Sequence, residues 1–210
     1  MFAVISDIHA NREALTAVFK ALLRLSPDKI ICLGDMVGYG PDPEWCVDAV
    51  RGACAVVVCG NHEAALVYGG RDLRRSAESS LKYHRTLLMP QGDCGEDGDV
   101  DRQRWDFLKA LPPRHIQDSY LFVHAAPRNP VNEYLREQDV RMRMERKLEQ
   151  NFEQVEWLAF IGHTHRPGVI TADRQFLVPE RPDWTYRAEQ GRKAIVNVAS
   201  VGQPRAGDPR

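Results

Sequence analysis

Three short apolar runs in the first 60 residues each lead into a polar motif, and this feature constrains the fold more than any other. The first run does not alternate polar and apolar residues, as expected of a strand that is buried on both faces. In chain order the expected elements are a strand over 2–7, a helix capped by Asn11, a strand over 29–35, a helix over 43–51 and a strand over 53–59. This β-α-β-α-β order predicts an α/β fold in which a layered sheet is flanked by helices.

The remainder of the chain is expected to combine helices with further short strands. Helices are predicted over 71–89 and 101–111, with a Gly- and Asp-rich surface loop over 91–101 between them. The densely charged stretch 133–152 is interpreted as a solvated helix or loop rather than a binding tail. Further strands are expected over 120–123, 156–161, 168–171, 175–178 and 193–198. Because neither a repeat nor a linker interrupts the chain, residues 1–210 are predicted to form one domain.

Composition argues against several classes of protein. The formal net charge is −1, so the chain has no basic surface of the kind that a dedicated nucleic-acid-binding protein needs. No apolar run reaches the roughly 18 residues of a membrane span, and no basic segment precedes the first strand as in a signal peptide. The five cysteines include no C-x-x-C pair and suit a reducing compartment. We therefore expect a cytoplasmic protein without membrane association.

Five of the seven histidines lie in the polar motifs. The motifs are Asp7-Ile8-His9, Gly34-Asp35-Met36-Val37-Gly38, Gly60-Asn61-His62-Glu63, Val123-His124-Ala125 and Gly162-His163-Thr164-His165. Imidazole, carboxylate and carboxamide ligands without thiolates suit divalent ions such as Mn, Fe, Zn or Ni. In D-x-H and H-x-H, alternate residues of an extended segment would point the same way. The glycines before Asp35, Asn61 and His163 would let the backbone turn sharply and approach the ions closely. Together the motifs supply enough ligands for two metal ions that share one site.

Taken in order, these motifs resemble those of the calcineurin-like metallophosphoesterase superfamily. The segments 5–11, 34–43 and 200–205 are similar to one subgroup, the small bacterial and archaeal phosphodiesterase-like phosphatases. The resemblance implies a four-layer α/β/β/α sandwich and metal-dependent hydrolysis of a small phosphomonoester, phosphodiester or nucleotide. It implies a bridging hydroxide as nucleophile and two ligand sets that share Asp35. These sets are Asp7, His9, Asp35 and His165 for the first ion, and Asp35, Asn61, His124 and His163 for the second.

The same resemblance assigns the roles of His62 and Glu63, whereas Tyr39, Arg128 and Arg166 are substrate candidates because of their positions beside the motifs. His62 is expected to act as general acid toward the leaving group, with Glu63 orienting it or stabilising its charge. Tyr39 either stacks on a base or fills its turn. Arg128 and Arg166 either grip a phosphate or belong to the solvated surface.

Two other histidines, His84 and His115, are expected to be surface or packing residues. The chain departs from the subgroup at Ala10, where glycine is usual, and at Val198-Ala199, where Pro-Gly is usual. These changes bear on substrate fit rather than on chemistry. Because relatives often continue beyond the position of Arg210, the second sheet is expected to be short, with an exposed edge open to pairing or dimerisation.

An alternative function is a non-catalytic scaffold of the same fold that binds a partner protein. Scaffold relatives tend to lose metal ligands or the histidine that corresponds to His62, whereas this chain has every such residue. An enzyme is therefore the favoured interpretation.

Overall fold

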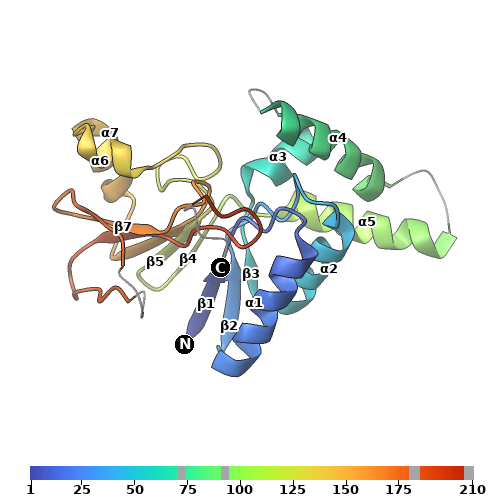
Figure 1. The fold of residues 1–210 in the computed structure, drawn as a ribbon, viewed down its shortest axis with the longest axis horizontal. Helices are drawn as coiled ribbons and strands as arrows, with labels where there is room; N and C mark the ends of the chain where they lie inside the picture. Colours follow the sequence, from blue (N-terminus) through green and yellow to red (C-terminus); the bar gives the residue numbers. More distant parts are fainter. Residues whose placement is uncertain (71–73, 91–94, 180–184, 206–210) are drawn as a thin grey trace.

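A computed structural model of the protein describes residues 1–70, 74–90, 95–179 and 185–205. Two β-sheets lie face to face, and helices cover the outer side of each (Figure 1). This is the four-layer α/β/β/α arrangement that the resemblance implied.

The first sheet contains three parallel strands in the order β1 (Phe2–Ile5), β2 (Lys29–Cys32) and β3 (Val56–Val57). Helices α1 (Arg12–Leu25) and α2 (Pro43–Ala53) connect them and pack on the outer face. The Asn11 side chain caps α1 by accepting a hydrogen bond from the Ala14 N–H at 3.0 Å. The strands end two or three residues earlier than predicted, because the polar motifs form loops beyond the edge of the sheet.

Three more helices follow, α3 (Asn61–Tyr68), α4 (Arg75–Leu88) and α5 (Gly95–Ala110). The prediction of a loop over 91–101 is wrong from residue 95 onward, and residues 91–94 lie outside the described part of the chain. The Arg104 side chain, within the predicted part of this helix, forms ion pairs with Glu44 and Asp48 of α2 at 3.0 and 2.6 Å. Because extending an existing helix costs less than starting one, the residues before 101 can continue the helix that is anchored there. None of the described helices has the length and apolarity that crossing a lipid bilayer requires.

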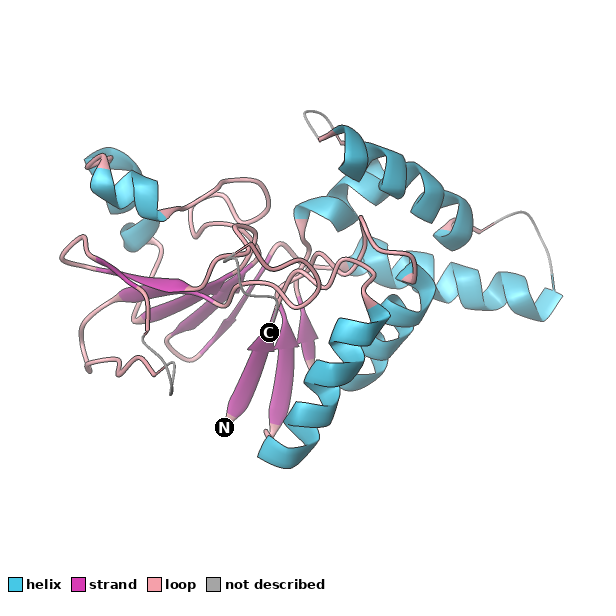
Figure 2. Cartoon of the chain, viewed as in Figure 1, coloured by secondary structure: helices cyan, strands magenta, loops and turns pink. Residues whose placement is uncertain are grey.

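The second sheet has six strands in the order β4-β5-β6-β9-β7-β8, so the prediction of a short second sheet is wrong. The strands are β4 (Arg114–Gln117), β5 (Tyr120–Val123), β6 (Leu158–Ile161), β7 (Gly168–Thr171), β8 (Phe176–Leu177) and β9 (Ala194–Asn197). Strands β5, β6 and β9 are parallel, and the others pair in antiparallel fashion. The charged stretch forms α6 (Glu137–Arg141) and α7 (Glu145–Glu153), which cover the outer face of this sheet (Figure 2).

Aromatic rings fill the space between the two sheets. Phe122 and Phe160 are neighbours on β5 and β6 with stacked rings, and their centroids lie 5.3 Å apart. Phe2 of β1 meets both rings edge-on at 5.6 Å. This packing fixes one sheet against the other, so that loops following β1, β2 and β3 meet loops following β5 and β6.

Candidate metal centre

All seven predicted metal ligands lie in one cluster at this junction. They come from loops after five strands, and all are buried except Asn61, which is partly exposed. Possible ligand atoms of Asp7, His9 and His165 lie within 4.8 Å of one another. The same is true of Asp35, His124 and His163, and of His9, Asp35 and His62.

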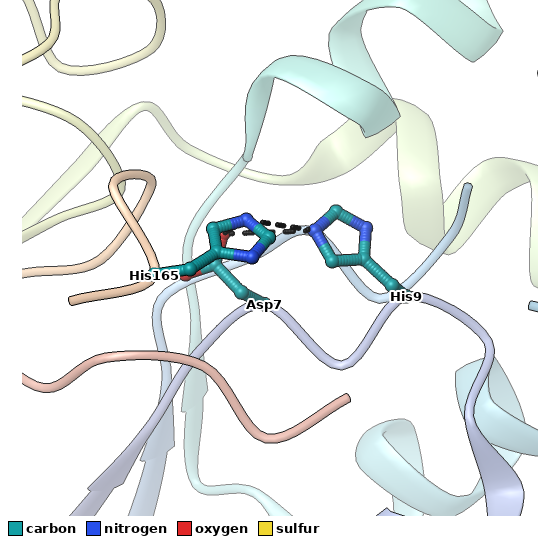
Figure 3. Close-up of side chains that lie close together, drawn as sticks. All are labelled: Asp7, His9 and His165. Atoms are coloured by element: carbon teal, nitrogen blue, oxygen red, sulfur yellow. Dashed lines mark hydrogen bonds and ion pairs between the residues drawn. The ribbon is translucent and has the colours of Figure 1, made fainter. Parts of the chain in front are cut away.

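The first half of the cluster joins the loops after β1 and β6. The Nε2 atoms of His9 and His165 face each other at 3.1 Å, with Asp7 beside them (Figure 3). Asp7 Oδ1 lies 3.1 Å from His165 Nε2 and 3.8 Å from His9 Nε2. These are ligands predicted for the first ion.

The second half joins the loops after β2, β3, β5 and β6. Its centre is His124 Nε2, which lies 3.0 Å from Asn61 Oδ1 and 3.1 Å from His163 Nδ1. Asp35 Oδ2 lies 3.4 Å from this nitrogen and 3.8 Å from His9 Nε2. A single carboxylate oxygen therefore stands between the two halves, where a bridging ligand belongs.

Backbone carbonyls determine which nitrogen of three imidazoles carries the proton. The Nδ1 atoms of His9, His124 and His165 each face a carbonyl oxygen, that of Val37 (3.1 Å), Leu33 (2.9 Å) and Gln203 (2.5 Å), respectively. Since a carbonyl only accepts, each Nδ1 donates its hydrogen, and in the neutral imidazole the Nε2 lone pair points into the cluster. Facing lone pairs repel unless a cation lies between them. Asp7 Oδ1 likewise has no hydrogen-bond partner among the described residues. The residues present therefore fit divalent metal ions.

The electrostatics of the cluster also favour cations. Burial alone would raise the pKa of Asp35, but the imidazoles of His124 and His62 hold it well below its usual range. Burial lowers the pKa of His124, yet the Asp35 carboxylate outweighs it and raises the value to about 9. Burial lowers the pKa of His9 to about 4 and that of His163 to about 3. Near neutral pH the metal-free site thus contains an ionised Asp35 and neutral His9 and His163, whereas His124 carries a proton that metal binding would displace.

The ligand loops have an unusual backbone conformation. The φ angles are positive at Asp7 (54°), His9 (51°), Asp35 (53°), His163 (61°) and His165 (60°). A non-glycine residue in this region costs about 1–3 kcal/mol and persists only where the surroundings enforce it. Hydrogen bonds between loops provide this constraint, for example from the Asp7 N–H to the Gly34 carbonyl at 3.0 Å. The D-x-H motif brings Asp7 and His9 to the cluster, and the H-x-H motif brings His163 and His165. The prediction that these two motifs have an extended backbone is wrong.

Two glycines permit the loops to approach each other. A Cβ atom at Gly60 would lie 2.2 Å from Asp35 Oδ1, and one at Gly162 would lie 2.1 Å from Ser6 Oγ and 2.3 Å from Asp7 Oδ2. Any side chain at these positions would displace a carboxylate of the cluster. The predicted reason for these glycines, close approach of the backbone, is confirmed.

Glu63 supports the Asp35 loop. Its buried carboxylate accepts hydrogen bonds from four backbone N–H groups, those of Asp35 (2.7 Å), Met36 (2.7 Å), Val37 (3.1 Å) and Gly60 (3.0 Å). Burial raises the pKa of Glu63 to about 7, and the charge of Asp35 adds to this effect. Within the described chain the His62 Nδ1 atom has no hydrogen-bond partner, so Glu63 does not orient His62 by a hydrogen bond. Its contacts make it a positioning residue for Asp35.

His62 and Tyr39 lie together beside the cluster. The His62 N–H donates to Asp35 Oδ1 at 2.9 Å, and its side-chain Nε2 lies 3.9 Å from Asp35 Oδ2. The Tyr39 ring lies 4.8 Å from that of His9 and 5.0 Å from that of His62. Burial lowers the pKa of His62, against the opposing effect of Asp35. Both side chains thus lie at the edge of the cluster, in contact with His9.

The two candidate arginines differ in their surroundings. The Arg128 guanidinium donates to Glu133 and Gln150, so an internal carboxylate holds the group that was expected to grip a phosphate. This arrangement argues against a substrate role for Arg128. Arg166 is exposed directly after His165 and lines a cavity next to the cluster.

Two residues beside the site were not assigned to it from the sequence. His84 is only 1% exposed, and it accepts from the Gly38 N–H (3.0 Å) and donates to the Gly40 carbonyl (2.9 Å), which fixes the loop carrying Tyr39. Its spacing from Ala77, Leu81 and Leu88 on the buried face of α4 was a usable signal. Tyr134 stacks on the His163 ring at 3.9 Å, and nothing in its charged segment indicated this.

Comparisons with known proteins agree with this geometry. A model of the family described as calcineurin-like phosphoesterase matches residues 1–187. Uncharacterized protein MJ0912 from Methanocaldococcus jannaschii is 32% identical over 212 residues, which cover 99% of this chain and 78% of that protein.

Two solved structures are similar over nearly the whole chain. The metallophosphoesterase from Sphaerobacter thermophilus has a TM-score of 0.75 and 32% identity, with 100% of this chain and 80% of that chain covered. Hypothetical protein PH1004 from Pyrococcus horikoshii has a TM-score of 0.67 and 17% identity, with 96% of this chain and 78% of that chain covered. At this identity the similarity shows a shared fold only.

Proposed function

Because the chain belongs to the calcineurin-like phosphoesterase family and is a metallophosphoesterase, we propose that it hydrolyses a small phosphate ester at a centre of two divalent ions. The observation that carries the proposal is the position of Asp35 Oδ2 between the two ligand groups, 3.8 Å from His9 Nε2 and 3.4 Å from His124 Nε2. Asp7, His9, Asp35 and His165 would hold one ion, and Asp35, Asn61, His124 and His163 the other. When bound, such a pair of ions lowers the pKa of water and neutralises the charge on the phosphoryl group.

The protein groups around the centre would position the substrate and move a proton. His62 would donate a proton to the leaving oxygen from Nε2, since this nitrogen lies 3.9 Å from the bridging carboxylate. Tyr39 would contact the ester from the same side. We propose Mn, Fe, Zn or Ni as the metal and a phosphomonoester, phosphodiester or nucleotide as the substrate.

We also propose that residues 1–210 form one domain and that two copies of the chain can pair through an exposed sheet edge. The described sheets end at β1 and β3 and at β4 and β8, which are the edges available for such pairing.

Turnover with defined metals tests the function. The metal-stripped protein is assayed with p-nitrophenyl phosphate and its bis-ester after addition of each of the four ions. Asp35→Asn is expected to reduce turnover at least 100-fold, roughly, since loss of an outer hydrogen-bond partner alone costs about 10–100-fold. Asp106→Asn, at an exposed aspartate of α5 that is not one of the candidate metal ligands, is the matched control and should turn over like the wild type. Absence of turnover with every ion would favour the scaffold instead.

His62 has its own test, which depends on the leaving group. His62→Asn should reduce kcat by about 10²–10⁴ for an alkyl phosphate, whose leaving oxygen needs a proton, and much less for p-nitrophenyl phosphate. Equal losses on both esters, with normal metal content, would rule out a general-acid role.

A further inference from the structure

A cavity of about 570 Å³ lies on the outer face of the second sheet, beneath the segment that leads into α6. Its floor is formed by outward-facing residues of four strands, Ile161, Ile170, Phe176 and Ile195. The three isoleucines are only 1–2% exposed, so the accessible apolar surface includes Phe176, which is partly exposed, and Val178 at the rim. Since a water molecule occupies about 30 Å³, the cavity is far larger than a phosphate group requires. Its volume lies within the range of roughly 300–1,000 Å³ that is typical of small-molecule sites.

The cavity adjoins the metal centre. Thr164, which stands between His163 and His165, and Tyr134, whose ring stacks on His163 at 3.9 Å, both belong to its lining. The Arg136 guanidinium lies 4.0 Å from the centroid of the same tyrosine ring. Two groups at these distances cannot share one face of the ring, so Tyr134 is held between His163 and Arg136. One tyrosine side chain thus forms the wall that the cavity shares with the ligands.

The charges of the lining favour an anionic occupant. Among the described residues that line it are three cationic side chains, Arg136, Arg166 and Arg205, and one carboxylate, that of Glu137. An apolar floor with cationic side chains suits a molecule that has a large apolar body and a negatively charged group.

We propose that this cavity binds the organic part of the substrate, an aromatic or aliphatic alcohol of naphthol size or larger, while its phosphate lies at the metal centre. The proposal rests on the proposed function and narrows its substrate class from any small phosphate ester to esters of bulky apolar alcohols. Phe176 and Val178 cover the organic group above the buried isoleucines, and the arginines attract the anionic ester. Such an ester is therefore hydrolysed more efficiently than a small one.

Two neighbouring residues of the β8 hairpin provide a matched pair of variants. Val178 lines the cavity and is 52% exposed, whereas Leu177 is 38% exposed and does not line it. Successive residues of an extended segment point to opposite faces, so a tryptophan at 178 enters the cavity and one at 177 does not. Because both positions are exposed, Val178→Trp and Leu177→Trp should retain the wild-type urea midpoint.

The experiment measures kcat/KM for 1-naphthyl phosphate and phenyl phosphate, and binding of 1-naphthyl phosphate to the metal-free protein by calorimetry in EDTA. Wild type and Leu177→Trp are expected to prefer the naphthyl ester about tenfold or more, by the usual worth of added apolar contact in a pocket. In Val178→Trp the preference should fall to about twofold or less and binding should weaken at least about fivefold.

Equal preference and equal binding in the two tryptophan variants would overturn the proposal. Turnover of both esters without preference, and without binding in EDTA, would also overturn it while leaving the proposed function intact. Binding of the naphthyl ester that only Val178→Trp weakens, without turnover of any ester, would support the cavity and refute the proposed function.

Discussion

Replacing His84 with leucine tests whether this buried side chain fixes the loop that carries Tyr39. The substitution removes one acceptor and one donor, which leaves the Gly38 N–H and the Gly40 carbonyl without their partners. A buried N–H that loses its partner costs about 1–3 kcal/mol. The Gly40 carbonyl is partly exposed and can bind water, so its loss is at the lower end, about 1 kcal/mol. The expected loss in the free energy of unfolding is therefore about 2–4 kcal/mol.

Urea unfolding in EDTA measures this loss without a contribution from bound metal. With a slope of about 2–3 kcal/mol per molar urea, the midpoint should fall by roughly 1 M or more. His115→Leu is the matched control, because the His115 ring is partly exposed and packs beside Phe122 at 6.0 Å. The free energy of unfolding of His115→Leu is expected to differ from that of the wild type by no more than about 0.5 kcal/mol. If His84→Leu were no more destabilising than this control, the proposed role of His84 would be refuted.

Three further predictions concern packing, metal and thiols. Gly162→Ala places a Cβ about 2.1 Å from Ser6 Oγ and should abolish turnover, whereas Gly52→Ala meets no atom within 4 Å and should leave turnover unchanged. Addition of metal at about 100 times its dissociation constant should stabilise the stripped protein by about 2.7 kcal/mol, hence by roughly 5–10 °C in Tm, and no shift would argue against binding. In a Cys94→Ser background, native protein should not react with Ellman's reagent at pH 8, and four rapid thiols without denaturant would disprove this. The reason is burial, which raises the pKa of the Cys46, Cys54 and Cys59 thiols to about 12. It also raises the pKa of the Cys32 thiol well above its usual value.

The convergence of the candidate ligands was predictable because they follow apolar strands. A parallel sheet brings the carboxyl ends of its strands to one edge, so Asp7, Asp35 and Asn61 had to converge. The backbone conformation was not predictable in the same way. Spacing alone favoured an extended Asp7-x-His9, whereas contacts with the Asp35 loop hold both residues at positive φ.

Contacts between distant segments explain the other errors. A buried glutamate next to a histidine was interpreted as its partner, but Glu63 accepts from four backbone N–H groups, three of them in the loop 35–37. The helix from Gly95 is longer than its Gly- and Asp-rich beginning indicated, and it continues a helix that Arg104 anchors to α2. Tyr134 reaches His163 only because the second sheet places both segments together. None of these contacts leaves a periodic pattern in the sequence.

Anomalous diffraction from a crystal grown with excess manganese tests the central claim most directly. The account predicts two peaks about 3.5–4 Å apart with Asp35 between them, one beside Asp7, His9 and His165 and the other beside Asn61, His124 and His163. A single peak, or two peaks that do not share Asp35, would contradict it.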